Sequence, residues 1–471
     1  LNLPDLSLNL TFDVPALSFP VPHIDFKLSL PSVELPGLPA MPNFPGLPDL
    51  PALPSIPNFG FDLPAIGMFQ IGDLPALQLF DFFDLSGSLT IERVEYNATL
   101  DDGTTVPTWA ITVNSVDGGI FAGVNGPGAS DDATGVNIAN VDAAIVVLIP
   151  KSSTDKRRWI SAVGTGGTAG IKGISDVTLQ ATGLSLLVNQ PMGKTSSGAV
   201  NTSLVDFAAN PLSVQMSDGS TVRVEHSAAA GPQLILSGTA DISFSDFFRV
   251  NGNIGVRKTT YDLQLSDGTT TPSNLLTIGG SGLSAFAGVN PGTADAAGLS
   301  LSGVNFAFVS ATDKLDASRR WNTLQATAAS VAALGIPDVT ISGTNLAVTI
   351  NRPDLNGVVA SYSATPLSVP VGGGQNYQIN LNGASGALLE ASGTLTVTVS
   401  DFFRVSGSFG LRRAAANVTL ADGTTADVTL LTLGIDGGTA FVGLSGGTTD
   451  AAGLTITNAD AAIAIASDVN N

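Results

Sequence analysis

The stretch Ser400–Gly407, with the sequence SDFFRVSG, decides the fold because it occurs three times. It returns as SDFFRVNG at Ser245–Gly252 and as FDFFDLSG at Phe80–Gly87. The three occurrences are 165 and 155 residues apart. Repetition at so long a period predicts tandem copies of one structural unit.

Other segments recur at matching distances and extend the repeat over most of the chain. The phrase is followed by an Asp-Gly pair in each copy, at 102–103, 267–268 and 422–423, and RRW at 157–159 returns at 319–321. We therefore predict an arm over 1–80, a first copy over 81–245, a second over 246–400 and an incomplete third over 401–471. Since the third copy breaks off at Asn471, we expect a longer parent protein.

The copies have the pattern of strands. Leu395, Val397 and Val399 alternate with threonines, which predicts a strand with one buried apolar face. The four Asp-Gly pairs, including 218–219, lie between such runs and predict hairpins. The one weak helix candidate in the copies is 326–334. We predict an all-β fold, in which tandem repeats of antiparallel sheet form an elongated architecture.

Residues 1–80 have a different pattern. From Pro36 to Pro57 a proline occupies every third position. The residue before each proline is large and apolar, namely Leu35, Leu38, Met41, Phe44, Leu47, Leu50, Leu53 and Ile56. A period of three predicts a polyproline II rod over 35–58. It is either a semi-rigid spacer or a rod whose apolar stripe docks in an apolar groove, in its own copies or in a neighbouring subunit.

Composition limits the possible partners. The 471 residues carry a net charge of −20, which argues against binding nucleic-acid phosphate. There is no cysteine, so neither disulfides nor thiolate metal sites are possible. No apolar run reaches the length of a transmembrane helix.

Residues for catalysis are sparse, and we expect no enzyme activity. His23 and His226 are the two histidines, neither recurs in the copies, and we expect His226 to be exposed at a strand end. The recurring aspartates, Asp81, Asp246, Asp401, Asp132, Asp295 and Asp450, are expected to cap turns. Calcium binding by these acids is the alternative, and no other cofactor is expected.

The RRW segments are the densest positive clusters. Their arginines, Arg157, Arg158, Arg319 and Arg320, are either solvated at a strand start beside a buried indole or form ion pairs between copies or subunits. We treat them, with the bulky residues of the rod, as candidate assembly residues.

The SDFFRVSG phrase, together with AFAGV and DVTISGTNLAVTINR, resembles repeats of very large secreted or surface-attached bacterial proteins of the adhesin type. This resemblance implies an extracellular or cell-surface location and a structural or adhesive role. We expect a self-associating structural protein, a part of a filament, sheath or surface layer. The alternative expectation is an adhesin-type binding protein or an apolar groove that holds lipid.

Overall fold

The computed structural model describes residues 69–78, 83–124, 134–172, 177–244, 248–400, 402–445 and 449–468. Side-chain surroundings are described for 90–119, 137–170, 178–243, 249–400, 402–445 and 449–467. The predicted polyproline rod lies outside the described residues.

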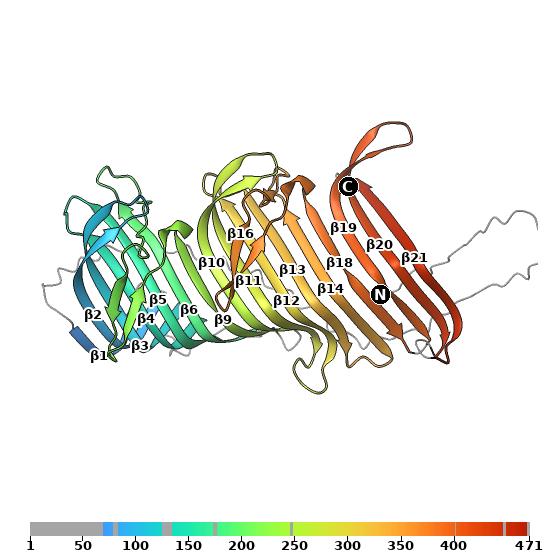
Figure 1. Ribbon diagram of the computed structural model, residues 1–471, viewed down its shortest axis with the longest axis horizontal. Helices are drawn as coiled ribbons and strands as arrows, with labels where there is room; N and C mark the ends of the chain where they lie inside the picture. The colour runs from blue at the N-terminus through green and yellow to red at the C-terminus, as the bar shows by residue number, and fades with distance from the viewer. Residues whose placement is uncertain are drawn as a thin grey trace, which may run out of the picture. The chain divides into compact units, whose positions relative to one another are not determined.

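One antiparallel sheet dominates the structure, as Figure 1 shows. Sixteen long strands pair with their neighbours in chain order, and the two-residue strand β15 joins β10 as a seventeenth. The long strands are β1 (Phe69–Gln78), β2 (Phe83–Thr99), β3 (Thr105–Val124), β4 (Thr134–Pro150), β5 (Lys156–Lys172), β6 (Val177–Lys194), β9 (Gln233–Phe244), β10 (Phe248–Leu265), β11 (Thr270–Val289), β12 (Ala297–Asp313), β13 (Arg320–Leu334), β14 (Val339–Arg352), β18 (Leu388–Val399), β19 (Phe403–Thr419), β20 (Thr425–Leu444) and β21 (Ala452–Asp468).

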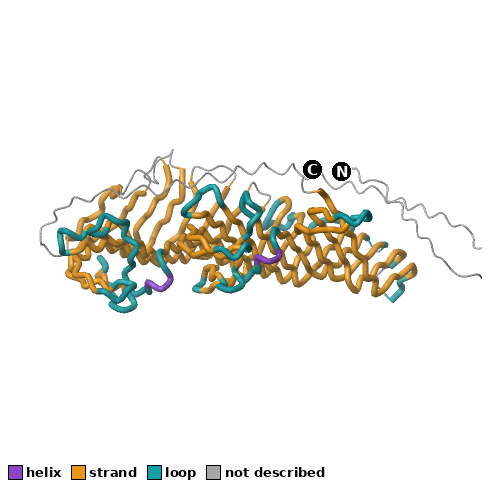
Figure 2. The backbone as a smooth tube through the Cα atoms, turned by 90° about the horizontal axis from the view of Figure 1, so that it is seen from above, coloured by secondary structure: helices purple, strands orange, loops and turns teal. Residues whose placement is uncertain are grey.

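Two insertions interrupt this order without breaking the sheet. The first follows β6 and contains β7 (Leu212–Gln215), β8 (Thr221–Val224) and the short helix η1 (Ala228–Ala230). The second follows β14 and contains β15 (Ala360–Ser361), β16 (Leu367–Gly372), β17 (Gln375–Ile379) and η2 (Gly383–Ser385). The two helical turns are purple in Figure 2. Because β6 pairs with β9 and β14 with β18, each insertion leaves the sheet and returns to the next strand.

The all-β prediction is confirmed, and so are the four Asp-Gly hairpins. The pairs at 102–103, 267–268 and 422–423 connect β2 to β3, β10 to β11 and β19 to β20, and the pair at 218–219 connects β7 to β8. The glycine has a φ between 80° and 86° in all four turns, a conformation that glycine adopts without steric cost.

Two sequence expectations differ from the structure. The segment 326–334 belongs to strand β13, because its alanines pair with both β12 and β14, and tertiary pairing outweighs the helix preference of alanine. Within the predicted arm, Phe69–Gln78 forms β1, which pairs with β2.

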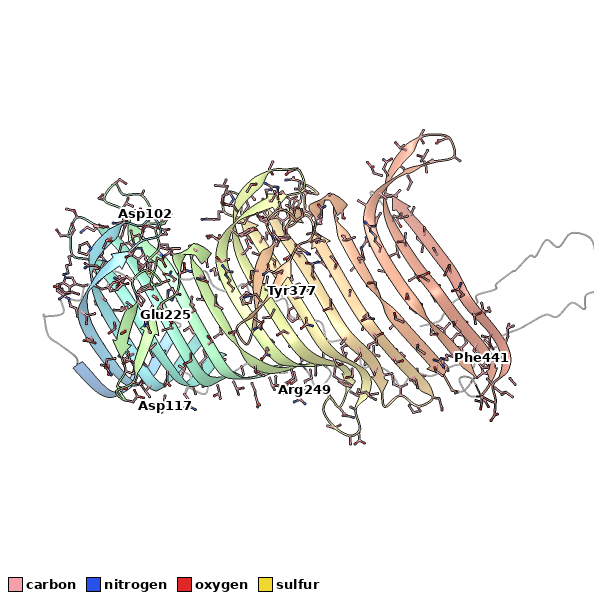
Figure 3. The ribbon with its side chains drawn as sticks, in the orientation of Figure 1. Asp102, Asp117, Glu225, Arg249, Tyr377 and Phe441 are labelled. Carbon is pink, nitrogen blue, oxygen red and sulfur yellow. The ribbon has the colours of Figure 1, made fainter. Side chains whose placement is uncertain are left out.

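Each insertion covers one end of the strands and closes a core. The first core joins Tyr96, Leu148 and Trp159 of the sheet to Phe207 and Val214 of the insertion. The second core has the same plan: Leu263, Leu275 and Trp321 of the sheet pack against Tyr362 and Val369 of the second insertion. Figure 3 shows the insertion residue Tyr377, which packs against the second core, in front of the sheet. Among the described residues, the ten largest fully buried side chains therefore all belong to these two cores.

Glycines allow the second insertion to approach the sheet closely. A Cβ atom at Gly255 or Gly279 would lie 2.6 Å or 2.5 Å from the carbonyl oxygen of Pro370 in β16. Since real Cβ atoms do not approach so closely, a side chain at either position would push β16 off the sheet.

A line of β-bulges crosses the sheet at one level. In β3, β11 and β20 the bulge residue is Asp117, Gly282 or Gly437, each with a positive φ. Its backbone N–H donates to a side chain of the next strand, Asp142 at 3.0 Å, Asn305 at 3.0 Å and Asp460 at 2.9 Å. A bulge bends its strand, so bulges at one level bend the sheet along one line.

Candidate functional site

The face of the sheet opposite the insertions carries large apolar side chains in continuous rows. One row runs across β6, β9 to β14 and β18, with each residue paired to the next: Leu186, Leu236, Val256, Ile278, Phe308, Leu324, Ile350 and Leu389. We call this side the apolar face and these eight residues the apolar row. The first seven are half-buried and Leu389 is 36% exposed.

The alternation predicted for the strand around Leu395 does place its apolar residues on one face, but that face is not fully buried as predicted. Leu395, Val397 and Val399 do share the apolar face with Phe403 and Val405, their partners on β19. However, they are only partly buried, and Phe403 is 37% exposed. The reason is that both described insertions cover the opposite face.

The two faces of the sheet differ in burial at the level of the bulges. At the level of the bulges, Leu184, Ala240 and Leu283 on the apolar face are buried, with exposures of 4%, 6% and 1%. On the opposite face at the same level, Thr239 and Asn345 are exposed. Leu184 and Leu283 are buried because they lie against glycines, since a Cβ at Gly238 would be 2.9 Å from Leu184 Cδ2 and one at Gly280 would overlap Leu283 Cδ1.

On the apolar face, glycines near the bulges make room for side chains from neighbouring strands. A Cβ at Gly238 would lie 2.9 Å from Leu184 Cδ2, and one at Gly393 would lie 2.6 Å from Leu346 Cδ2. Each leucine follows a bulge residue with a positive φ, Gly183 or Asn345. The same leucine-on-glycine contact thus recurs at two places on the apolar face.

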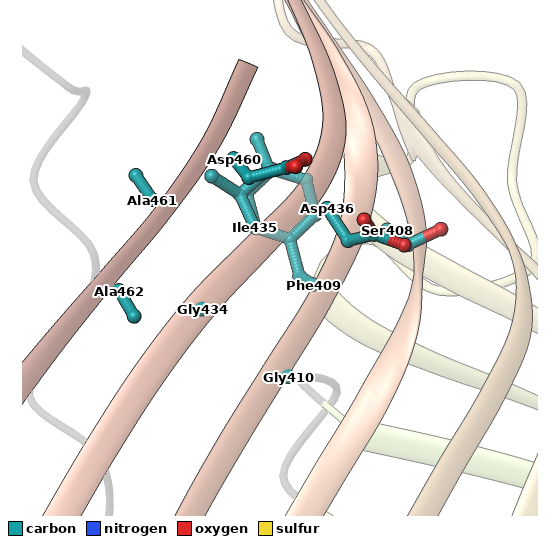
Figure 4. A pocket seen from close by; sticks show the side chains of 9 residues that line it. All are labelled: Ser408, Phe409, Gly410, Gly434, Ile435, Asp436, Asp460, Ala461 and Ala462. Atoms are coloured by element: carbon teal, nitrogen blue, oxygen red, sulfur yellow. The ribbon is translucent and has the colours of Figure 1, made fainter. Parts of the chain in front are cut away.

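A hollow of about 620 Å³ lies at the bulge level between β19, β20 and β21 (Figure 4). Its lining includes Phe409, Ile435 and Ala461, with the carboxylates of Asp436 and Asp460 at the bulge. One carboxylate, that of Asp460, is used to accept the N–H of Gly437. The surface that lines this hollow is mostly apolar.

The RRW arginines lie at the ends of β5 and β13, beside the two buried tryptophans. Arg157 contacts Asp155 with an N–O distance of 2.7 Å, and its guanidinium lies 5.3 Å from the Trp159 ring centroid. This pair holds the pKa of the Asp155 carboxyl below its usual value. The Arg158 guanidinium donates to the backbone carbonyl of Arg157.

In the second copy the corresponding arginine reaches the insertion. Arg319 Nε donates to Asp354 Oδ2 at 2.8 Å, and the Asp354 side chain is fully buried. Arg319 also lies 3.6 Å from Asp313, whereas Arg320 is exposed. The ion pairs found for Arg157 and Arg319 in the described structure are therefore within one copy, and a role in assembly remains a prediction.

The recurring aspartates fall into two groups. Asp81, Asp246, Asp401 and Asp132 lie outside the described residues, and Asp295 and Asp450 are exposed. Over the described ranges, no cluster of three or more His, Asp or Glu residues could hold a metal ion. Arg249, the arginine of the repeated phrase on β10, forms an ion pair with Asp241 on the neighbouring strand β9.

The expectation that His226 is exposed is wrong. Its ring is half-buried, 5.1 Å from the Phe207 ring, and Nε2 lies 3.2 Å from the Ser161 hydroxyl. Burial lowers the pKa of His226 to about 4, which keeps the ring neutral at physiological pH. No local sequence pattern indicates this burial, because the contact joins residues 65 positions apart. His23 lies outside the described residues.

The bulky residues of the predicted rod also lie outside the described residues, so the apolar face is the part of the candidate site that the structure places. No helix in the described ranges is long and apolar enough to cross a membrane. Comparison with family models, with curated proteins and with solved structures found no match, so the chain is assigned to no family.

Proposed function

We propose that this chain is a segment of an extracellular structural protein, a filament, sheath or surface layer, in which tandem copies extend one continuous sheet. The function is mechanical. The copies give length and stiffness, and the proline-rich arm supplies an apolar element that fills an apolar surface of its own copies or of a neighbouring subunit.

The observation that carries the proposal is strand pairing across both copy boundaries. At the first boundary β9 pairs with β10 from Gln233–Thr259 to Phe244–Phe248, and at the second β18 pairs with β19 from Leu388–Ala414 to Val399–Phe403. Each junction is a full strand ladder with no linker. Bending such a junction would break backbone hydrogen bonds, so a chain joined in this way resists bending.

Electron microscopy of the purified chain, followed across a concentration series, tests the proposal. We expect stiff particles that associate into ordered fibres or layers. The variant Val397→Pro removes a backbone donor in the middle of β18 and should kink or break the particles at the second boundary. The control Leu355→Pro lies in an exposed turn closed by a Gly357 to Asp354 hydrogen bond, at a position where proline fits, and should change nothing. Separate globules on flexible tethers would refute the proposal.

A second candidate function is favoured by one observation, the half-exposed apolar row. An apolar surface of this kind could hold acyl chains of lipid. Lipid extraction and native mass spectrometry distinguish the two functions, because monomers that co-purify with lipid support the second and lipid-free fibres support the first.

A further inference from the structure

Strand β21 forms an edge of the described sheet, and its residues are exposed on both faces. Among the described residues, β21 pairs with β20 and with no other strand (Figure 1). Every residue from Ala452 to Ser467 except Ala459 is exposed, and the large apolar ones are between 52% and 68% exposed: Leu454, Ile456, Ile463 and Ile465. An edge strand of this kind presents a row of backbone N–H and C=O groups with which another strand can pair.

β21 lacks the features that normally protect an edge strand. Natural sheets block their edges with proline, with lysine or with very short strands. At the other end of the described sheet, β1 contains Pro75, whose nitrogen carries no hydrogen to donate. β21 is 17 residues long and contains no proline, lysine or arginine. This edge is therefore open to pairing.

The first two copies show which strand fits this edge. β4 and β12 hold the place of β21 in their copies, and all three strands have a positive φ at the same position, at Asn140, Gly303 and Asn458. In the sheet, β4 pairs with β5 and β12 pairs with β13 along nearly their whole length. β5 and β13 are the strands that contain the RRW tryptophans. The repeat therefore indicates a strand of the same type at the free edge of β21.

We propose that the free edge of β21 docks one antiparallel strand of the β13 type, presented by a second molecule whose sheet has such a strand at its edge. Both β5 and β13 of this chain are paired on two sides, so neither is available to its own β21. This inference rests on the proposed function and deepens it, because it names the edge at which the sheet is extended and the strand that extends it. Strand addition of this kind gains affinity from backbone hydrogen bonds and specificity from alternate side chains.

The register of the docked strand follows from the second copy. The second and third copies are 155 residues apart, so each pair of β12 and β13 gives a pair of β21 with the docked strand. Phe308 pairs with Leu324 on the apolar face, and position 308 corresponds to Ile463. A docked strand of the β13 type therefore places a leucine beside Ile463, which is 61% exposed without it. Burial of such side chains favours this register over a shifted one.

The other face of β21 fits the same partner. Val309 and Ala311 on β12 are fully buried, and Ala311 is paired with Trp321. Their equivalents on β21, Ala464 and Ala466, are exposed. Because position 466 is alanine, as position 311 is, the tryptophan of a docked strand has the same small neighbour that Trp321 has in the second copy.

Disulfide cross-linking with a synthetic peptide tests this inference, since the chain contains no cysteine. The peptide has the sequence of β13, Arg320–Leu334, with Thr323→Cys, and the full chain carries Ala464→Cys. The control peptide carries Gln325→Cys instead, on the same face two residues away, and the expected register places this residue opposite Ala462. Residues directly opposite each other have Cβ atoms about 4.5–5.5 Å apart and diagonal ones about 7–8 Å, whereas a disulfide needs about 3.5–4.5 Å.

We expect the Thr323→Cys peptide to cross-link at least about tenfold faster than the Gln325→Cys peptide. Equal rates, or a faster reaction of the control, would overturn the inference. Dimers of the Ala464→Cys chain that form without peptide and prevent its cross-linking would overturn it too, because they would show that β21 pairs with its own copy.

Electron microscopy of the same chain keeps the two proposals apart. Fibres or layers without cross-linking at the expected register defeat this inference alone. Cross-linking at the expected register without fibres or layers defeats the proposed function alone.

Hydrogen exchange of the unsubstituted chain gives a second measurement that needs no cysteine. An excess of the parent peptide should slow amide exchange in Ala452–Asp468 at least about tenfold, because docking adds backbone hydrogen bonds to this strand. The edge strand at the other end, Phe69–Gln78, is the internal control and should exchange at the same rate with and without peptide. No change in Ala452–Asp468, or equal slowing of both strands, would contradict the inference.

Discussion

Replacing Trp321 with alanine should release the second insertion and leave the first in place. Trp321 is fully buried in the second core, and its indole Nε1 donates to the Val358 carbonyl at 3.1 Å. Truncating a buried tryptophan to alanine costs about 3–5 kcal/mol, because the side chain leaves a cavity and the carbonyl loses its donor.

This loss of stability predicts a change in the rate of amide hydrogen exchange. Local opening of the insertion should become more favourable by the same free energy, and every 1.36 kcal/mol is tenfold, so amide exchange in 353–387 should rise about 160- to 5,000-fold. Hydrogen exchange followed by mass spectrometry measures this directly, with the peptides of 195–232 as an internal reference.

The matched control is Trp159→Ala, the equivalent change in the first core. Trp159 donates to the Ser203 carbonyl at 2.8 Å and is 1% exposed. We expect it to accelerate exchange in 195–232 and to leave 353–387 protected. If either substitution loosened both insertions equally, or neither, the reasoning that two separate cores hold the insertions would be refuted.

Three further predictions concern single sites. Arg319→Ala should cost about 3 kcal/mol in urea unfolding because it leaves the buried Asp354 carboxylate without its cation, whereas Arg320→Ala should stay within about 0.5 kcal/mol; equal effects would contradict this. Gly282→Asp should be tolerated, since the first copy has aspartate at the equivalent bulge and no atom lies within 4 Å of a Cβ there, but Gly282→Val should cost more than about 1 kcal/mol by thermal melting. Because the folded-state pKa of His226 is about 4, below its unfolded value, the unfolded chain takes up the proton first and stability should fall as the pH drops from about 6.5 toward 4. The urea midpoint at pH 7 and pH 4.5 should differ less in His226→Gln than in the parent chain, and an unchanged difference would show that His226 is not responsible.

The strand content could be predicted from local pattern. Alternation in Leu395, Val397 and Val399 and the Asp-Gly pairs indicate strands and hairpins through interactions between near neighbours in the chain. These features are local in sequence, and the structure has them where they were expected.

Which face is buried could not be predicted, because burial depends on segments distant in sequence. Ala307 and Val309 look unremarkable beside Phe306 and Phe308, yet they are fully buried under the second insertion while the two phenylalanines are only half-buried. The size of a side chain indicates that it should be hidden, but it does not indicate which element will cover it.

The sequence by itself determined the strands, their turns and the period of the copies, since each follows from conformational preferences over a few residues. Only the tertiary structure decided that both described insertions pack on one face of the sheet and that the face with the apolar row stays partly exposed. Both outcomes depend on packing between residues tens of positions apart, such as β16 on Gly255 and Gly279, and no local pattern encodes such a contact.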